Sequence, residues 1–275
     1  MADLRIAGVR AWVGLFWIGY IVLRVILRII LGKERRNRWM EMLDLHYGAG
    51  WGVRFGILRC RYEPHVVRVI SKVFRESGST FIDVGAFIGF HTLYAYKIIG
   101  KRKTSLIVAV EPDPRNYQAL IYRLPETVNI RAVRLAIWIS DEDEVEFYVG
   151  ASRWRGSGSI SPTKWHKNNG FLTGESIVVK TVRLDTLVRR MGISVVDLVK
   201  MDIEWAEYPV LTDPTLNLSA VRNLVVEVHY KLMSRESIEI HRYLKRKGYN
   251  VVALPPELDG RTYHIIATRD SKIPW

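Results

Sequence analysis

The stretch from Phe81 to Gly89 constrains the fold of this chain more than any other feature of the sequence. It reads Phe-Ile-Asp-Val-Gly-Ala-Phe-Ile-Gly, an apolar run that passes directly into a turn containing two glycines. We expect a buried strand over 80–84, then the turn, then a helix over about 90–99. Gly85 and Gly89 have no Cβ and let a ligand approach the backbone closely. The pattern predicts a Rossmann-type sheet with a ligand at the helix N-terminus.

A second apolar run, 106–110, ends at Glu111, which follows Gly89 by 22 residues. In folds of this type, a carboxylate at the end of the second strand, about 20 residues after the glycine turn, accepts hydrogen bonds from the ribose hydroxyls. Pro112 and Pro114 then end the strand and open a helix, because proline is well tolerated in a first helical turn. The two features together predict a bound nucleoside.

The glycine turn differs from a dinucleotide fingerprint. Asp83 precedes Gly85 by two residues, and the third glycine of G-x-G-x-x-G is missing. A carboxylate at this place would repel a phosphate, but it suits a ligand with a cationic amino group and a sulfonium. The turn therefore favours S-adenosylmethionine over NAD, and the sequence contains no P-loop motif.

Five sequence blocks stand out along the chain. They are Asp83-Val-Gly-Ala-Phe-Ile-Gly-Phe-His-Thr92, Val110-Glu-Pro-Asp-Pro114, Arg183-Leu-Asp-Thr-Leu187, Leu198-Val-Lys-Met-Asp-Ile-Glu-Trp-Ala-Glu207 and Val225-Val-Glu-Val-His229. In this order they resemble FkbM-type S-adenosylmethionine-dependent methyltransferases, and the resemblance runs from about 61 to 269. It implies a class I methyltransferase sheet, α/β and mostly parallel, with seven strands and a C-terminal antiparallel hairpin from 250–254 and 261–268. One position departs from the family pattern, because Trp205 stands where the family usually has glycine.

The expected cofactor residues come from the first strands of this sheet. Asp83, Gly85 and Gly89 are predicted to line the methionine side of S-adenosylmethionine, and Glu111 its ribose. Asp141 follows the third strand, where the resemblance implies contacts with adenine.

The expected catalytic residues lie where the next strands end. Lys200, Asp202, Glu204 and Glu207 follow the apolar run 195–199, so we predict one charge-compensated cluster with perturbed pKa values. Asp202 is the first choice for a base or an acceptor-orienting group, with Glu204 and Glu207 in support. No metal is assigned, since Asp202 and Glu204 lack a third ligand within sequence reach.

The strand near 223–228 ends with a second polar pair. Alternation places Glu227 and His229 on the same face of this strand, so both side chains can point into the crevice. His229 is the best histidine candidate for a general base, because imidazole titrates near neutral pH.

Residues 1–40 are predicted to form a separate, membrane-associating helix with a basic flank, followed by a methyltransferase domain over 41–275. Residues 11–23 are uncharged, and Arg10, Arg24 and Arg28 share one narrow helical face. A single span, an in-plane helix and a helix packed on the protein itself all agree with this pattern. We expect attachment to an anionic membrane surface, and hence the cytoplasmic face of a membrane.

The composition leaves three functions in competition. The net charge of +13 indicates an anionic partner, and the single cysteine excludes an internal disulfide framework. The preferred function is a membrane-attached O-methyltransferase acting on a hydroxyl of a sugar, glycan or lipid-linked saccharide. The first alternative is an RNA methyltransferase, because the segment 153–166 combines basic and aromatic residues. The second is an inactive binding protein in which Trp205 blocks the acceptor site.

The segment 141–181 interrupts the alternation of strands and helices. Polar and apolar residues alternate over 141–149, as in a strand with one solvent-exposed face, and a long glycine-containing segment follows. Such a segment is typical of a functional or mobile loop, and we expect it to cover the acceptor.

Overall fold

The computed structural model describes residues 63–76, 79–151, 155–162, 168, 170–254 and 262–270. The chain divides into two compact units, Met1–Arg61 and Tyr62–Trp275, and all described residues belong to the second. The expected N-terminal helix and the boundary at 40/41 lie outside the described residues. Within the part of the chain that is described, no helix is long and apolar enough to cross a membrane.

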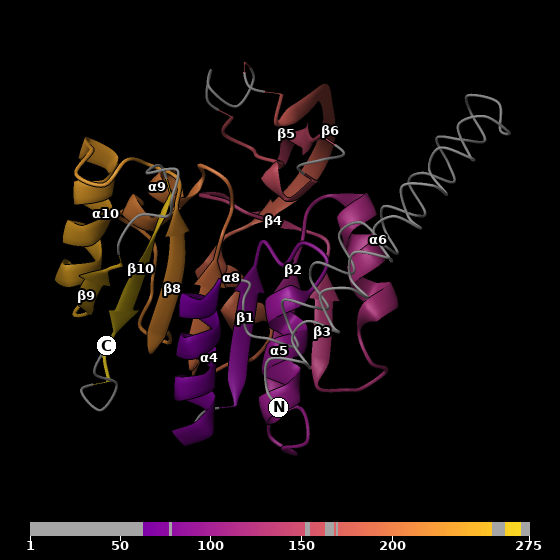
Figure 1. The fold of residues 1–275 in the computed structure, drawn as a ribbon, viewed down its shortest axis with the longest axis vertical. Helices are drawn as coiled ribbons and strands as arrows, with labels where there is room; N and C mark the ends of the chain where they lie inside the picture. Colours follow the sequence, from indigo (N-terminus) through magenta and orange to yellow (C-terminus); the bar gives the residue numbers. More distant parts are fainter. Residues whose placement is uncertain are drawn as a thin grey trace, which may run out of the picture. The chain divides into compact units, whose positions relative to one another are not determined.

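The core of the second unit is a seven-stranded sheet in the order β3-β2-β1-β7-β8-β10-β9. The first five strands in this order are parallel, whereas β10 runs antiparallel to both β8 and β9 (Figure 1). The bounds are β1 Thr80–Val84, β2 Leu106–Val110, β3 Ile130–Val133, β7 Leu198–Met201, β8 Asn223–Val228, β9 Asn250–Ala253 and β10 Tyr263–Thr268. The predicted class I methyltransferase topology, with its antiparallel C-terminal pair, is confirmed.

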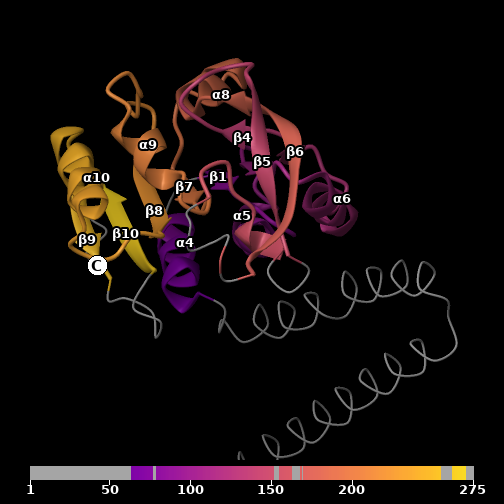
Figure 2. The same ribbon diagram turned by 90° about the horizontal axis from the view of Figure 1, so that it is seen from above.

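Helices cover both faces of this sheet (Figures 1 and 2). Helix α4 and helix α5 pack on one face through a cluster that includes Ile70, Phe81 and Ile99. The opposite face carries α8, α9 and α10. The bounds are α4 Pro64–Glu76, α5 Phe90–Ile99, α6 Pro114–Arg123, α8 Leu184–Arg190, α9 Glu207–Thr212 and α10 Arg235–Arg246.

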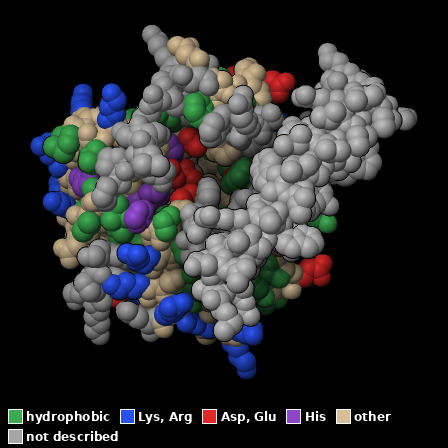
Figure 3. Space-filling view, in the orientation of Figure 1, with side chains coloured by type: hydrophobic (Ala, Val, Ile, Leu, Met, Phe, Trp, Pro, Cys, Tyr) green, Lys and Arg blue, Asp and Glu red, His purple; other side chains and the backbone are tan. Residues whose placement is uncertain are grey.

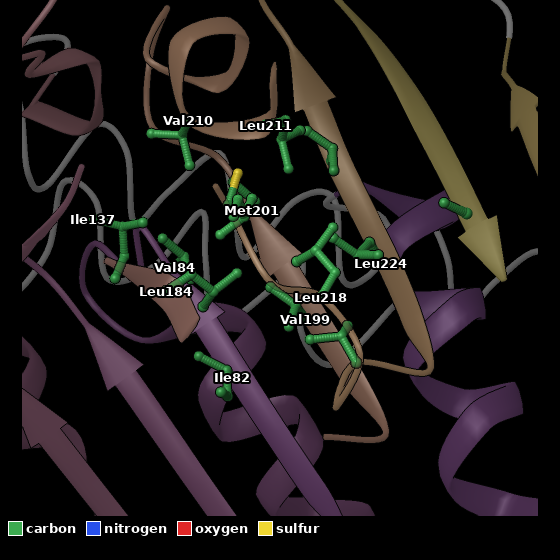
Figure 4. Close-up of a cluster of buried hydrophobic side chains, with 14 of the residues drawn as sticks. Ile82, Val84, Ile137, Leu184, Val199, Met201, Val210, Leu211, Leu218 and Leu224 are labelled. Atoms are coloured by element: carbon green, nitrogen blue, oxygen red, sulfur yellow. The ribbon is translucent and has the colours of Figure 1, made fainter. Parts of the chain in front are cut away.

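The largest apolar cluster lies under α8, α9 and α10. Figure 4 shows Ile82, Val84 and Met201 of the sheet packed against Leu184 of α8 and Leu211 of α9. These side chains are almost completely buried. The central strands are buried on both faces, which explains why their sequences are continuous apolar runs.

Local sequence signals explain where the helices begin. Before α6, the Asp113 side chain accepts a hydrogen bond from the Arg115 N–H at 2.8 Å, and Pro114 occupies the first helical position. Before α10, the Ser234 hydroxyl accepts one from the Ser237 N–H at 3.2 Å. Strands β1, β2 and β8 and helix α5 match the bounds predicted from the sequence.

The segment 141–181 contains the predicted strand and one strand that the sequence did not predict. The predicted strand is β5 Glu144–Gly150, which is followed by the short helix η2 Arg155–Ser157 and by the beginning of the unpredicted β6 Leu172–Val182. Strand β6 pairs with β5 and with β4 Ala136–Ile137 in a separate three-stranded sheet. The sequence of β6 was difficult to recognise as a strand because most of its residues are exposed or partly exposed.

Candidate functional site

Polar side chains converge at the carboxyl ends of β1, β7 and β8. Asp83 lies beside Lys200 in register, and Lys200 lies beside Val225. Because neighbouring parallel strands end at the same edge, the residues that follow them are also neighbours. Acidic and histidine side chains meet near the middle of the face shown in Figure 3. We call this group the acid–histidine cluster; its members are Glu63, Asp83, His91, Lys200, Asp202, Glu204, Glu207, Glu227, His229 and His264.

The glycine turn after β1 fits closely against the end of β7. Gly85, Phe87 and Gly89 all have positive φ values, of 74°, 50° and 89°. A Cβ built on Gly85 would lie 1.7 Å from the backbone oxygen of Asp202. A side chain at this position is therefore excluded by its φ and by its neighbour, as we expect for a backbone segment that closes a cofactor crevice.

Asp83 is oriented by the helix that follows the turn. Its Oδ2 accepts a hydrogen bond of 2.6 Å from the Thr92 hydroxyl of α5, and the residue is completely buried. Its Oδ1 is buried and accepts no hydrogen bond from the residues that the structure describes. An unsatisfied buried carboxylate oxygen is costly, and the ammonium group of S-adenosylmethionine would satisfy it.

Glu111 lies at the end of β2, next to the same turn. Its Oε2 accepts from the Phe87 N–H at 2.8 Å, and its Oε1 accepts from the Asp113 N–H at 3.0 Å. Burial raises the pKa of Glu111 to about 8, although the hydrogen bonds from Asp113 and Phe87 oppose this shift. The carboxyl group is thus held in place beside the turn, where the prediction assigns the ribose.

Asp141 uses both carboxylate oxygens to anchor the start of α8. It accepts hydrogen bonds of 2.8 Å from the Arg183 N–H and from the Thr186 hydroxyl. Burial raises the pKa of Asp141, but these hydrogen bonds and the nearby arginines lower it more, so that it lies below its usual range. Its contact with adenine stays a prediction.

Lys200 connects the two halves of the site. Its Nζ donates to Asp202 Oδ2 at 3.1 Å and to the Gly85 backbone oxygen at 3.4 Å, and its side chain is 4% exposed. Burial lowers the pKa of Lys200, but Asp202 and Asp83 raise it above its usual range, so the ammonium stays charged. Lys200 therefore fixes the position of Asp202 relative to the glycine turn.

His229 is oriented by a buried glutamate. Its Nδ1 lies 3.0 Å from Oε1 of Glu207, a residue that is completely buried. A carboxylate can only accept, so Nδ1 is the donor and Nε2 faces the cluster. There Nε2 lies 3.3 Å from Glu204 Oε2 and 3.9 Å from Asp202 Oδ1. The structure thus brings together His229, Asp202 and Glu204, as the sequence predicted.

The pKa values of Glu204 and His229 are both raised, so both side chains keep their protons to higher pH. Burial raises the pKa of Glu204 to about 8, against the opposing effect of His229. Burial lowers the pKa of His229, but Glu204 and Glu207 together raise it well above its usual range. Near neutral pH, His229 and Glu204 are therefore both mainly protonated, and the pair can take a proton from a ligand only in the fraction of molecules in which Glu204 is ionised.

Trp205 lies against the imidazole of His229. Glu204 and Trp205 are two successive residues with positive φ, of 49° and 76°. The Trp205 carbonyl accepts a 2.7 Å hydrogen bond from the Tyr230 hydroxyl, and its indole is 6.1 Å from the His229 ring and 5.1 Å from the Tyr230 ring. A large side chain thus occupies a left-handed position where glycine would be unstrained.

The segment between β5 and β6 contacts both halves of the site. Ser159 forms an isolated bridge with Tyr148, and its hydroxyl donates to the Glu204 backbone oxygen. A Cβ built on Gly156 would lie 4.0 Å from the Phe87 ring of the glycine turn. These contacts agree with a covering role for the segment, although residues 163–167 lie outside the described part.

Sequence reasoning missed three members of the cluster. Glu63 precedes α4, His91 lies in the first turn of α5, and His264 lies in β10. The position of His91 in the sequence is explained equally well by helix capping or packing, and nothing in the sequence singles out His264. Only the pairing of β10 with β8 places His264 opposite Glu227. The sequence feature that could have revealed His264 is the predicted C-terminal antiparallel hairpin, because its second strand returns the chain to the end of β8.

Among solved structures, this chain is similar to methyltransferases of low sequence identity. Fibrillarin from Aeropyrum pernix, solved with bound S-adenosyl-L-methionine, has a TM-score of 0.47 and 13% identity, over 76% of this chain and 75% of that chain. Methyltransferase FkbM from Methylobacillus flagellatus KT has a TM-score of 0.41 and 14% identity, over 69% and 43%.

A curated relative is AMB antimetabolite synthetase AmbE of Pseudomonas aeruginosa, which is 25% identical over 206 residues. The alignment covers 62% of this chain and only 9% of that protein.

A family model described as the methyltransferase FkbM domain matches residues 83–251, which is more than half of the chain. The matched range includes the glycine turn, Glu111, the end of β7 and His229. The match confirms the resemblance seen in the five blocks, and with it the expected cofactor, S-adenosylmethionine. The chain belongs to the methyltransferase FkbM domain family.

Proposed function

We propose that this protein is an O-methyltransferase that acts on a hydroxyl of a sugar, glycan or lipid-linked saccharide at a membrane surface. The observation that carries this proposal is the orientation of His229 by Glu207, with Nε2 directed at Glu204 and Asp202. An alcohol is a poor nucleophile while protonated, so transfer to a hydroxyl needs a nearby group that takes its proton. Residues 1–40 would supply the membrane attachment.

The roles of the residues follow from their positions. S-adenosylmethionine, when bound, supplies the methyl group. Asp83 and Glu111 hold it at the glycine turn, while Asp202, fixed by Lys200, orients the acceptor hydroxyl. The acceptor oxygen would take the methyl group from the sulfonium, and its hydroxyl proton would pass to Glu204 beside His229 in the molecules in which Glu204, with a pKa of about 8, is ionised. Positioning the two reactants in line is the main contribution of such a site.

The experiment that tests the proposal uses the full chain and S-adenosylmethionine labelled in its methyl group. Candidate acceptors are soluble glycans, glycolipids in anionic vesicles and, as the alternative, structured RNA. We expect label in the saccharide fraction, located on oxygen by mass spectrometry of the hydrolysed product. Label in RNA alone would replace the proposal with the RNA alternative. A folded chain that does not bind S-adenosylmethionine would leave only the inactive binding protein.

The raised pKa of Glu111 predicts that cofactor binding at pH 7 releases about one proton. In the free protein the carboxyl group, with its pKa of about 8, is protonated at pH 7. Two ribose hydroxyls donate best to the ionised form, so binding favours loss of that proton. Cofactor affinity should therefore increase between about pH 5 and pH 8, by up to about tenfold per unit.

Calorimetry in buffers of different ionisation enthalpy measures this proton release directly. Glu111→Gln should remove the dependence on the buffer and weaken binding. Glu144→Gln, an exposed change on β5, serves as the matched control and should keep both properties. An unchanged proton release in Glu111→Gln would disprove the assignment.

Trp205 is predicted to select the acceptor. Trp205→Gly removes the indole beside His229 and relieves a left-handed strain of about 1–2 kcal/mol. We expect a free energy of unfolding equal to or above that of the parent, an unchanged cofactor Kd and a KM for the acceptor raised at least about tenfold. Urea unfolding measures the free energy of unfolding, and steady-state kinetics measures the KM for the acceptor. Equal KM values would exclude Trp205 from the acceptor site.

A further inference from the structure

The acid–histidine cluster contains a group of three side chains that the proposed methyl transfer does not use. Glu63, Glu227 and His264 each offer one ligand atom, and the three atoms lie within 4.8 Å of one another. His264 Nε2 is 3.8 Å from Glu63 Oε2 and 3.9 Å from Glu227 Oε2. The residues come from the start of α4, from β8 and from β10, so the fold alone brings them together.

The backbone directs these side chains towards one point. His264 is the direct cross-strand partner of Glu227, and directly opposed residues in an antiparallel pair project on the same face. Val225 and Ile266, two residues away on each strand, belong to the apolar cluster under α4. Glu63 immediately precedes α4, and its carboxylate therefore approaches the same face of the sheet.

Two of the three ligand atoms, those of His264 and Glu63, are buried without a hydrogen bond from the described residues. His264 is 2% exposed, and its Nε2 has no hydrogen-bond partner among the described residues. Glu63 Oε2 is likewise buried without a hydrogen bond. Leaving an imidazole nitrogen and a carboxylate oxygen buried in this state is costly. A bound cation would satisfy both atoms at once.

The charge of the cluster also favours a cation. Six carboxyl groups, those of Glu63, Asp83, Asp202, Glu204, Glu207 and Glu227, gather around one lysine and three histidines. Lys200 bonds to Asp202 and Gly85, and His229 is directed at Glu204. Beside Glu63, His91 Nε2 lies 3.5 Å from Oε2, but burial lowers the pKa of His91, so this imidazole does not balance the Glu63 charge near neutral pH. His229 Nε2 lies 3.9 Å from Glu227 Oε1, further than from Glu204.

We propose that Glu63, Glu227 and His264 bind one divalent transition-metal cation. One imidazole and two carboxylates suit Zn²⁺ or Mn²⁺ better than Ca²⁺. Ligand bonds of about 2.0–2.2 Å place neighbouring ligand atoms about 3.4 Å apart, so the two distances from His264, 3.8 Å and 3.9 Å, need only a slight closure. Three protein ligands leave an open position for water. The cation clamps the start of α4 to β8 and β10 and holds Glu227 in place.

A second group, Asp202, Glu227 and His229, shares Glu227 with this site. The Lys200 ammonium bonded to Asp202 repels a cation there, and His229 Nε2 lies closer to Glu204 than to either of its partners in the group. We therefore assign the cation to the side of Glu63 and His264. A cation at Glu63, Glu227 and His264 should be lost in His264→Gln, whereas a cation at Asp202, Glu227 and His229 should be lost in Asp202→Asn. The experiment compares these variants.

The test is calorimetric titration of the full chain with Zn²⁺, Mn²⁺ and Mg²⁺ after removal of metal by a chelator, without S-adenosylmethionine. We expect one equivalent of Zn²⁺ to bind with micromolar or tighter affinity, and Mg²⁺ to bind at least about 100-fold more weakly. Glu63→Gln and His264→Gln should each weaken Zn²⁺ binding at least about 100-fold. His65→Gln, an exposed histidine whose ring is 6.5 Å from that of His264, is the matched control and should bind as the parent does.

Folding of each variant is checked separately, by S-adenosylmethionine affinity and circular dichroism. Zn²⁺ should raise the Tm of the parent and of His65→Gln, but not that of the two ligand variants. Absence of Zn²⁺ binding by the parent, or equal binding by both ligand variants, would overturn the proposal. Loss of binding in Asp202→Asn with retention in His264→Gln would overturn it as well, by moving the ion to the second group.

Discussion

Gly85→Ala is expected to abolish cofactor binding and to destabilise the protein by more than about 4 kcal/mol. The added Cβ would lie 1.7 Å from the backbone oxygen of Asp202, which is not a flexible group that can move aside. The φ of +74° adds a cost of about 1–2 kcal/mol for a residue with a side chain. Urea unfolding and calorimetry with S-adenosylmethionine measure the two effects.

Gly192→Ala is a matched control for this variant. Gly192 also has a positive φ, of 66°, but a Cβ built there meets nothing within 4 Å. The free energy of unfolding of Gly192→Ala should therefore fall by only about 1–2 kcal/mol, and its cofactor affinity should equal that of the parent. The difference between the two variants isolates the contact with Asp202. Equal losses would mean that the close approach of turn and strand has no energetic consequence.

His229→Gln is expected to lower kcat by about 10²–10⁴-fold while the cofactor Kd changes less than about threefold. Glutamine can still donate to Glu207, so the buried carboxylate keeps a partner, but the amide has no ionisable proton to share with Glu204 and cannot help that carboxylate to ionise and take the proton of the acceptor. The pair with Glu204 is thereby lost. Rates are measured with labelled cofactor and with the acceptor that the labelling experiment identifies.

His241→Gln is the corresponding control, because His241 lies on α10, outside the acid–histidine cluster. Among the described residues, its side chain forms a hydrogen bond with the Ser237 backbone oxygen of the same helix, through Nδ1. It should retain the parent's kcat. A His229→Gln variant that transfers methyl groups at more than a tenth of the parent rate would exclude His229 as the proton acceptor. Activity would then point to Asp202.

The sequence predicted the elements best where burial dominates. Strands β1, β2 and β8 are continuous apolar runs, and their bounds agree with the prediction. It also placed Asp202 and His229 correctly, because position at a strand end determines proximity in a parallel sheet. Strand β6 was missed because its pattern is mostly exposed, and its pairing with β5 depends on tertiary context.

The contacts that were not predicted join residues far apart in sequence. Glu63 and His264 meet only because α4 packs on the sheet and β10 returns beside β8. Asp141 has the expected location after β3, yet its carboxylate is already bonded to Arg183 and Thr186. No periodicity in a single sequence encodes such long-range partners.

The bridge that Lys200 makes between Gly85 and Asp202 has a consequence for the engineering of this protein. A substitution at Asp202 that is intended to change the acceptor also releases one partner of Lys200, whose other partner is the glycine turn. Acceptor preference and affinity for the methyl donor are therefore not independent design variables. New acceptor preferences are better sought at Trp205, which changes the wall of the site without touching this bridge.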